Sequence, residues 1–214
     1  MKKTITTALT LLSIGAQAER PQTLLEMSGA RVPFDKKAAA LVLIDFQNEY
    51  VSGRLPLPKI EAVVGETRRL LEWARARKMP VIHVFHQGQT GGLFDVSVEA
   101  GKVIAELAPK AGEVVIYKVF PNAFNGTELE RVIRKEGRTS ILFAGLMTHM
   151  CLDASVRAAF DKGFHSAVVA STTATRALPG VGGAALDAEV LKRASLASLQ
   201  DLVALIIPSV NDLR

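Results

Sequence analysis

The chain has 214 residues, of which 49% are hydrophobic and 22% are charged, a composition typical of one globular domain with a buried core. The formal net charge is +5. Basic residues are mixed with acidic ones along the sequence, so nucleic acid is not an expected partner. The chain has a single cysteine, Cys151, which excludes an internal disulfide. Its thiol is then buried and inert, paired with a cysteine of another chain, or free to react.

The first 18 residues have the order of regions found in a secretory signal peptide. Two lysines follow Met1, residues 4–15 are apolar, and an Ala-Gln-Ala segment ends at Ala18. The apolar stretch has no polar face, which disfavours an ordinary N-terminal helix, and it is too short to span a bilayer. We expect cleavage after Ala18, export to the periplasm and no membrane association afterwards, with residues 19–38 as an irregular lead-in.

Short apolar runs alternate with helical patterns from residue 39 to residue 208, which is typical of βαβ units. The first run is apolar without alternation, as expected of a central parallel strand covered on both faces. The expected strands are residues 40–45, 81–85, 113–118, 140–146, 165–171 and 202–207. The expected helices are residues 60–78, 96–107, 127–135, 151–162 and 184–199. We predict a three-layer α/β/α, Rossmann-like domain with a mainly parallel six-stranded sheet, followed by a tail at residues 209–214.

A glycine-rich segment, residues 177–183, precedes the last expected helix. Its glycines lack the spacing of a phosphate-binding loop and no Lys-Ser/Thr pair follows them. We interpret it as a flexible loop or lid.

Four reactive side chains fall at the carboxyl ends of the expected strands. Asp45 ends the first, His86 follows the second, Lys118 ends the third, and Cys151 opens the helix after the fourth. Ligands bind at this edge of open parallel sheets. Each residue has a structural alternative, since an aspartate caps turns and a lone cysteine is often a small buried hydrophobe. Their joint placement favours a catalytic site.

A cysteine nucleophile at this edge has the partners that its chemistry needs. A thiol attacks as the thiolate, and a helix N-terminus and a nearby cation both lower its pKa. We therefore expect a lowered pKa for Cys151, with Lys118 as the cation and Asp45 as the group that accepts and returns the proton. Backbone N–H groups of residues 145–151 would hold the oxyanion.

Three segments resemble the motifs of the isochorismatase-like cysteine hydrolases, a superfamily that includes nicotinamidases, N-carbamoylsarcosine amidohydrolases and streptothricin hydrolase. They are LIDFQN around Asp45, YKVFPNAF around Lys118 and AGLMTHMC ending at Cys151. The resemblance covers residues 39–208. It implies an Asp-Lys-Cys triad, a thioester on Cys151 and a homo-oligomer. It also implies a cis peptide before Met147 and an oxyanion hole made by the N–H groups of Met147 and Cys151.

Departures from the family pattern narrow the expected activity. Nicotinamidases carry an Asp-x-His metal segment after the first strand, whereas residues 51–60 contain neither residue, so no catalytic metal and no cofactor are expected. His83 is then expected to be packed and His86 to lie in the pocket. Isochorismatases proper lack cysteine at the nucleophile position. The resemblance therefore favours the streptothricin hydrolase and N-carbamoylsarcosine amidohydrolase-like branch and C–N bond hydrolysis.

Candidate substrate-binding residues lie near the same motifs: Phe46, Gln47, His86, Phe94, Phe124 and His149. Core packing is the alternative for each phenylalanine, and hydrogen bonding to loop backbone is the alternative for Gln47. The leading hypothesis is a metal-independent cysteine hydrolase of a small amide. A non-catalytic small-molecule-binding domain of the same fold and a single-cysteine redox protein remain as alternatives.

Overall fold

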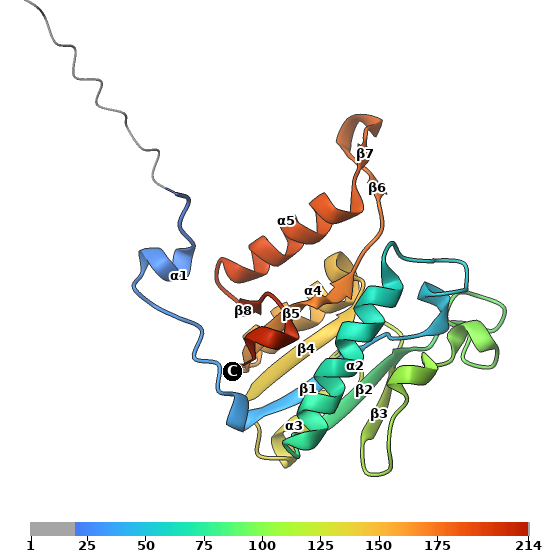
Figure 1. Ribbon diagram of the computed structural model, residues 1–214, viewed down its shortest axis with the longest axis horizontal. Helices are drawn as coiled ribbons and strands as arrows, with labels where there is room; N and C mark the ends of the chain where they lie inside the picture. The colour runs from blue at the N-terminus through green and yellow to red at the C-terminus, as the bar shows by residue number, and fades with distance from the viewer. Residues whose placement is uncertain (1–19, 214) are drawn as a thin grey trace, which may run out of the picture.

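Figure 1 shows the computed structural model, which describes residues 20–213; the predicted signal peptide lies outside them. Six strands form one sheet in the order β3-β2-β1-β4-β5-β8, and all neighbouring strands are parallel. The predicted three-layer fold with a parallel six-stranded sheet is therefore confirmed. The strands are β1 (Ala39–Ile44), β2 (Val81–His86), β3 (Val114–Lys118), β4 (Ser140–Leu146), β5 (His165–Ala174) and β8 (Ala204–Ile207).

Helices cover both faces of the sheet, and Figure 1 shows α2 crossing in front of it with α4 behind. Alternate residues of β1 belong to two different cores. Leu41 and Leu43 pack with α2, whereas Val42 and Ile44 pack with α3, α4 and α5. This two-sided burial explains why the strand is apolar without alternation. The helices are α2 (Ile60–Ala76), α3 (Leu129–Lys135), α4 (Asp153–Asp161) and α5 (Ala188–Gln200), and a short α1 (Leu24–Met27) lies in the lead-in.

Residues 96–107 do not form the helix expected from their pattern. They contain two short 3-10 turns, η3 (Glu99–Gly101) and η4 (Ala105–Leu107). The Ile104 N–H donates to the Phe46 carbonyl, and the Asn48 N–H donates to the Lys102 carbonyl. The backbone groups of this segment therefore pair with the chain after β1 instead of closing helical turns.

The glycine-rich segment, expected to be a flexible loop or lid, forms a hairpin. Strands β6 (Leu178–Pro179) and β7 (Ala185–Leu186) pair antiparallel, and the hairpin projects from the domain beyond α5 (Figure 1). Helix α5 consequently begins at residue 188, where Asp187 caps it by accepting from the N–H groups of Glu189 and Val190.

The strand order reverses direction between β1 and β4. The chain builds β2 and β3 on one side of β1 and then returns to place β4 on the other side. Crevices at such switch points, outside the carboxyl ends of the strands, are where parallel sheets bind ligands. None of the helices in residues 20–213 has the length and apolar character needed to cross a membrane.

Candidate active site

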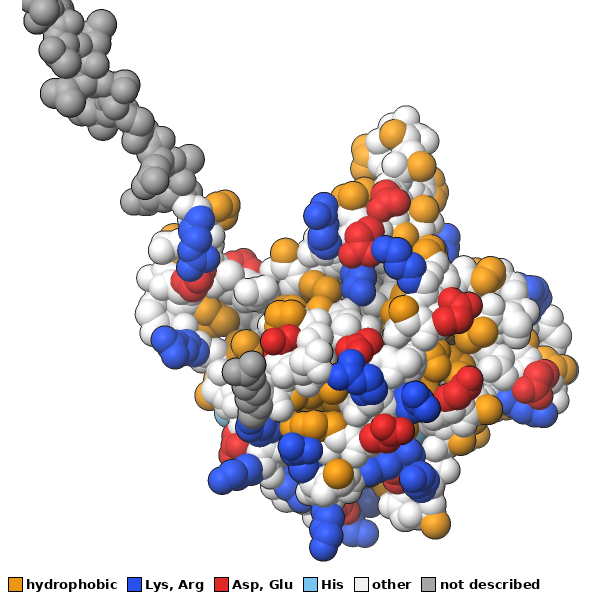
Figure 2. All heavy atoms as spheres, in the orientation of Figure 1, with side chains coloured by type: hydrophobic (Ala, Val, Ile, Leu, Met, Phe, Trp, Pro, Cys, Tyr) orange, Lys and Arg blue, Asp and Glu red, His pale blue; other side chains and the backbone are white. Residues whose placement is uncertain are grey.

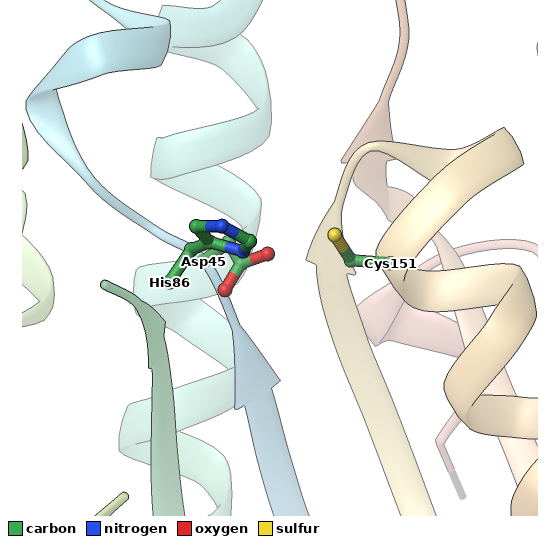
Figure 3. Close-up of side chains that lie close together, drawn as sticks. All are labelled: Asp45, His86 and Cys151. Atoms are coloured by element: carbon green, nitrogen blue, oxygen red, sulfur yellow. The ribbon is translucent and has the colours of Figure 1, made fainter. Parts of the chain in front are cut away.

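Asp45 and Cys151 face each other across the switch point. Asp45 follows β1 in a left-handed backbone conformation with φ 57°, which aspartate tolerates better than most residues. One carboxylate oxygen of Asp45, one ring nitrogen of His86 and Sγ of Cys151 all lie within 4.8 Å of one another. Figure 3 shows these side chains converging from the ends of β1 and β2 and from the turn after β4.

Lys118 completes the cluster from the end of β3. Its ammonium lies 2.8 Å from Oδ2 of Asp45, and both side chains are fully buried. The same ammonium lies 3.1 Å from Nδ1 of His86. A buried charge requires a partner, and the Asp45 carboxylate and the His86 imidazole together hold the Lys118 ammonium in place.

The turn that carries Cys151 differs from an ordinary helix start, because it is wider than an α-helical turn. A π-helical turn, η5 (Thr148–Leu152), precedes α4, so Cys151 lies inside this turn and not at the first residue of an α-helix. The peptide between Leu146 and Met147 is cis, as the family resemblance implies. The Ser155 hydroxyl donates to the Cys151 carbonyl at 2.6 Å and accepts from the Ala123 N–H at 2.9 Å.

The expectation of a lowered thiol pKa is wrong for the resting site. Burial and, after it, the negative charge of Asp45 raise the pKa of Cys151 to about 12, against the smaller lowering effect of Lys118. The sequence indicated a cation near the thiol. It did not show how deeply the thiol is buried or how strongly the Asp45 carboxylate raises its pKa. The resting cysteine is therefore a thiol, and attack requires its proton to be removed by a base.

The charge states of the other groups suit that requirement. Burial raises the pKa of Asp45, against the opposing effect of Lys118, which makes its carboxylate a stronger base than an exposed aspartate. Burial and then Lys118 lower the pKa of His86. The neutral imidazole can accept a hydrogen bond from the ammonium through Nδ1.

Asp45, His86 and Cys151 carry donor atoms of the kind that bind metal ions, and these atoms are close together. The ammonium of Lys118 already contacts the first two, so a bound ion would have to displace it. His83 does not join the cluster. It is buried, and its Nε2 lies 2.9 Å from Oε2 of Glu113, which agrees with the packed position expected for it.

The structure brings some candidate pocket residues to the site and removes others. Phe94 packs against His86 with ring centroids 5.1 Å apart, and His149 lies in η5 and contacts the Thr175 hydroxyl through Nδ1. Phe46 is buried in the core beneath α2. Phe124 stacks on Phe164 in the helical layer instead. Phe46 and Phe124 are therefore core residues, as the alternative interpretation of the sequence allowed, and not substrate-binding residues.

Gln47 is also not available to a substrate. Its Nε2 donates to the carbonyls of His86 and Gly101, and its Oε1 accepts from the His86 N–H. The side chain is completely buried. It fixes the end of β2 against the chain after β1, and so acts on the site by holding the His86 backbone.

Three residues near the site escaped sequence reasoning. Glu49 is buried and accepts from the N–H groups of Phe94 and Arg54. Tyr50 is buried against Phe94; burial raises its pKa, and the charge of Asp45 raises it further. Glu49 and Tyr50 follow the first motif directly, but their residue types give no signal that they hold the aromatic wall. Ser155, described above, is likewise an ordinary helix residue in the sequence.

Two hollows flank the cluster. One of about 480 Å³ is lined by His86, the loop after it and Val119. The other, of about 420 Å³, includes Thr173 and Thr175 at the end of β5, and Thr173 bonds the Thr148 hydroxyl at 2.7 Å. Both open at the carboxyl edge of the sheet, and His86 is the member of the cluster that lines one of them.

The fold and the site define an α/β enzyme domain with a buried carboxylate, ammonium and thiol at its switch point. The isochorismatase domain model matches residues 39–204, and the chain belongs to this family of hydrolases. It is 33% identical over 172 residues, 80% of this chain and 88% of the other, to the secreted isochorismatase effector Isc1 of Verticillium dahliae.

Two further similarities come from Pseudomonas putida. Maleamate amidohydrolase is 32% identical over 158 residues, which cover 66% of this chain and 74% of that protein. The crystal structure of an isochorismatase from strain KT2440 has a TM-score of 0.85 and 35% identity, covering 89% of this chain and 98% of the other. The predicted family is thereby confirmed.

Proposed function

We propose that this chain is a metal-independent cysteine amidohydrolase that cleaves a C–N bond of a small amide through a thioester on Cys151. The observation that carries the proposal is the buried Asp45–Lys118 ion pair with the thiol beside it. The ammonium supplies the positive charge that a metal would otherwise supply. The similarity to a protein named maleamate amidohydrolase supports an amide as the substrate class.

Acylation begins with proton transfer from the Cys151 thiol to the Asp45 carboxylate. The sulfur forms a bond to the amide carbonyl carbon, and the carbonyl electrons move to oxygen, where the N–H groups of Met147 and Cys151 donate to the oxyanion. The intermediate then expels nitrogen, which takes the proton from Asp45. A thioester and a free amine or ammonia result.

Deacylation uses the same residues in reverse. Asp45 removes a proton from water, the hydroxide attacks the thioester carbon, and the sulfur leaves as the intermediate collapses. The proton on Asp45 then returns to the sulfur, which restores the thiol and the ion pair. The Lys118 ammonium is held between the carboxylate and the neutral His86, and it stabilises the sulfur whenever that atom carries negative charge.

The pocket residues have different roles in this proposal. Phe94 and His149 contact the substrate from the two sides of the thiol. His86 orients the Lys118 ammonium through Nδ1 and presents the rest of its ring to the hollow. Phe46, Gln47 and Phe124 support these groups from the core and do not touch the substrate.

Hydrolysis of maleamate and a panel of other small amides, followed by chromatography and mass detection, tests the proposal. The wild type is expected to hydrolyse at least one compound, and Cys151→Ala is expected to lose that activity while keeping the wild-type circular dichroism spectrum. Cys151→Ser keeps the size of the side chain but not the reactivity, and serves as the matched variant. Full activity of Cys151→Ala on the same compound would exclude the cysteine mechanism.

The two alternatives predict other results. A thiol redox protein requires an accessible thiolate, and the raised pKa of Cys151 disfavours it; turnover of peroxide with an external thiol would be its sign. A non-catalytic binding domain would bind a small amide without hydrolysing it. The buried ion pair, costly in a domain that performs no chemistry, favours the hydrolase.

Export is proposed on the order of charged, apolar and small residues in positions 1–18, with support from a relative described as secreted. N-terminal analysis of the protein from a bacterial periplasm should find Glu19 or a close neighbour first. We also propose one catalytic domain at residues 39–208 and a homo-oligomeric assembly, which sedimentation would measure.

A further inference from the structure

A cleft lies at the amino-terminal edge of the sheet, opposite the candidate active site. Its volume is about 420 Å³, and its lining comprises five cationic side chains and three apolar ones: Lys36, Lys37, Arg77, Lys78, Arg138, Ala39, Trp73 and Met79. No acidic residue lines it. We infer that this basic cleft binds a multivalent anion, a small molecule with two or more phosphate or carboxylate groups.

The five cations are not neutralised by the protein itself. Within residues 20–213 none of them forms a salt bridge with a carboxylate, whereas the arginines of α2 and α3 outside the cleft commonly do. Asp35, the acidic residue next to Lys36 in the sequence, accepts the Lys37 N–H through Oδ1 and forms no salt bridge with either lysine. The positive charge is therefore free to act on a ligand.

Arg138 gives the cleft a buried donor. Its Nη1 donates to the Lys37 carbonyl at 2.8 Å, which fixes the guanidinium, while its Nε is buried without a hydrogen-bond partner in the described part of the chain. An unpartnered buried donor is costly, and because Arg138 lines the cleft, a turn of its guanidinium would bring this donor to an anionic oxygen. Arginine presents several N–H groups in a plane that suits phosphate and carboxylate.

Helix electrostatics account for only part of this charge. Arg77 caps the end of α2 and Lys78 follows it, positions where cations complement the helix dipole. Lys36 and Lys37 belong instead to the 3-10 turn before β1, and Arg138 to the connection before β4. Figure 2 shows Lys and Arg side chains gathered along the lower edge of the view, where Figure 1 places the start of β1 and the end of α2.

The cleft is separate from the catalytic cluster. It adjoins Ala39, the first residue of β1, whereas Asp45 follows the last, so the two sites lie about 20 Å apart along the strand. An anion in the cleft does not contact Cys151. The inference consequently stands whether or not the proposed amidohydrolase activity is found.

Trp73 allows the cleft to be observed directly, because it is the only tryptophan in the chain and Arg77 lies over its ring at 4.3 Å. An anion that draws Arg77 away from the ring should change the indole fluorescence. The full chain is titrated with pyrophosphate, with citrate and, as a monovalent control, with acetate, at physiological salt. Pyrophosphate and citrate distinguish phosphate from carboxylate as the preferred group.

We expect saturable binding of pyrophosphate, citrate or both, and none of acetate. Lys36→Gln/Lys78→Gln should weaken binding by about tenfold or more, as expected when charged hydrogen bonds are lost. Lys102→Gln/Lys162→Gln removes the same charge outside the cleft, from lysines that pair with glutamates, and should leave the affinity unchanged. No saturable change with either probe, or equal weakening in both double variants, would overturn the inference.

Discussion

Asp45→Asn separates the two effects that Asp45 has on Cys151. In the wild type the carboxylate raises the pKa of the thiol, but it is also the only base that faces the sulfur in the proposed mechanism. The amide keeps the shape of the side chain and removes both the charge and the basicity. The variant should therefore have a more readily ionised cysteine and yet no amidase activity.

The size of the change follows from the distance. The sulfur and the carboxylate oxygen are at most 4.8 Å apart. At this distance the repulsion between the carboxylate and a Cys151 thiolate is about 3.5 kcal/mol in an effective dielectric of about 20. This corresponds to a fall of roughly two to three pKa units. Because nucleophilicity falls as the pKa falls, the alkylation rate at neutral pH should rise only about three- to fourfold per unit, or about tenfold or more in total.

The assay is the rate of iodoacetamide labelling of Cys151 as a function of pH, followed by intact mass. Asp161→Asn is the matched control, since Asp161 is the exposed last residue of α4 and lies in no ion pair of the described residues. Circular dichroism verifies that Asp45→Asn is folded. A labelling rate at neutral pH equal to or below that of the wild type would refute the reasoning about the carboxylate.

Three other substitutions test the site and its supports. His86→Ala should lower kcat about tenfold by loss of a hydrogen bond to a charged group, with little change in KM, and His86→Gln should recover part of it; a change in KM alone would contradict the orienting role. Glu113 has a pKa of about 2, because hydrogen bonds from Arg75 and other donors outweigh burial, so its stabilisation is present above about pH 4.5 and disappears as the pH falls towards 2. Urea unfolding of Glu113→Gln should show a deficit of about 1–2 kcal/mol at pH 7, after allowance for solvent screening, that shrinks on acidification, and a constant deficit would oppose the assignment. Gly145→Ala places a Cβ 2.7 Å from Cβ of Ile44 and should cost about 1–3 kcal/mol in thermal unfolding; an unchanged melting temperature would show that β1 and β4 can separate there.

Much of the fold could be predicted because its central strands are buried on both faces. Residues 141–146 contain no polar side chain, and the expected strand 140–146 forms β4 with those bounds. In a parallel sheet the carboxyl ends of β1, β3 and β4 lie at the same edge. The sequence therefore predicts that Asp45, Lys118 and the Cys151 turn share this edge. Strand direction, which the alternation of strands and helices reveals, places them at one edge, whereas their proximity also depends on the strand order.

Features that depend on what side chains contact could not be predicted. The apolar spacing of residues 96–107 suits a helix, but their backbone groups bond to the chain after β1. Phe124 follows the lysine motif, yet its ring turns into the helical layer. The pKa of Cys151 depends on burial and on which of two opposite charges lies nearer, and the sequence contains neither distance.

The basic cleft shows the same limit for charge. Lysines and arginines at positions 36–37, 77–78 and 138 are far apart in the sequence and suggest no stripe. They converge because the segments before β1, after α2 and before β4 all lie at the amino-terminal edge of a parallel sheet. The order of charges along the sequence therefore does not predict this basic cleft, because the fold brings its residues together from three separate segments.

The central claim is that Cys151 carries the acyl group during turnover. Acid quenching of the wild type during hydrolysis of an amide that it cleaves, followed by intact mass and peptide mapping, tests this claim most directly. The account predicts a mass increase equal to the acyl group, located on Cys151 and absent from Cys151→Ser. Steady turnover with the adduct on another residue, or unimpaired turnover by the Cys151→Ala variant, would contradict it.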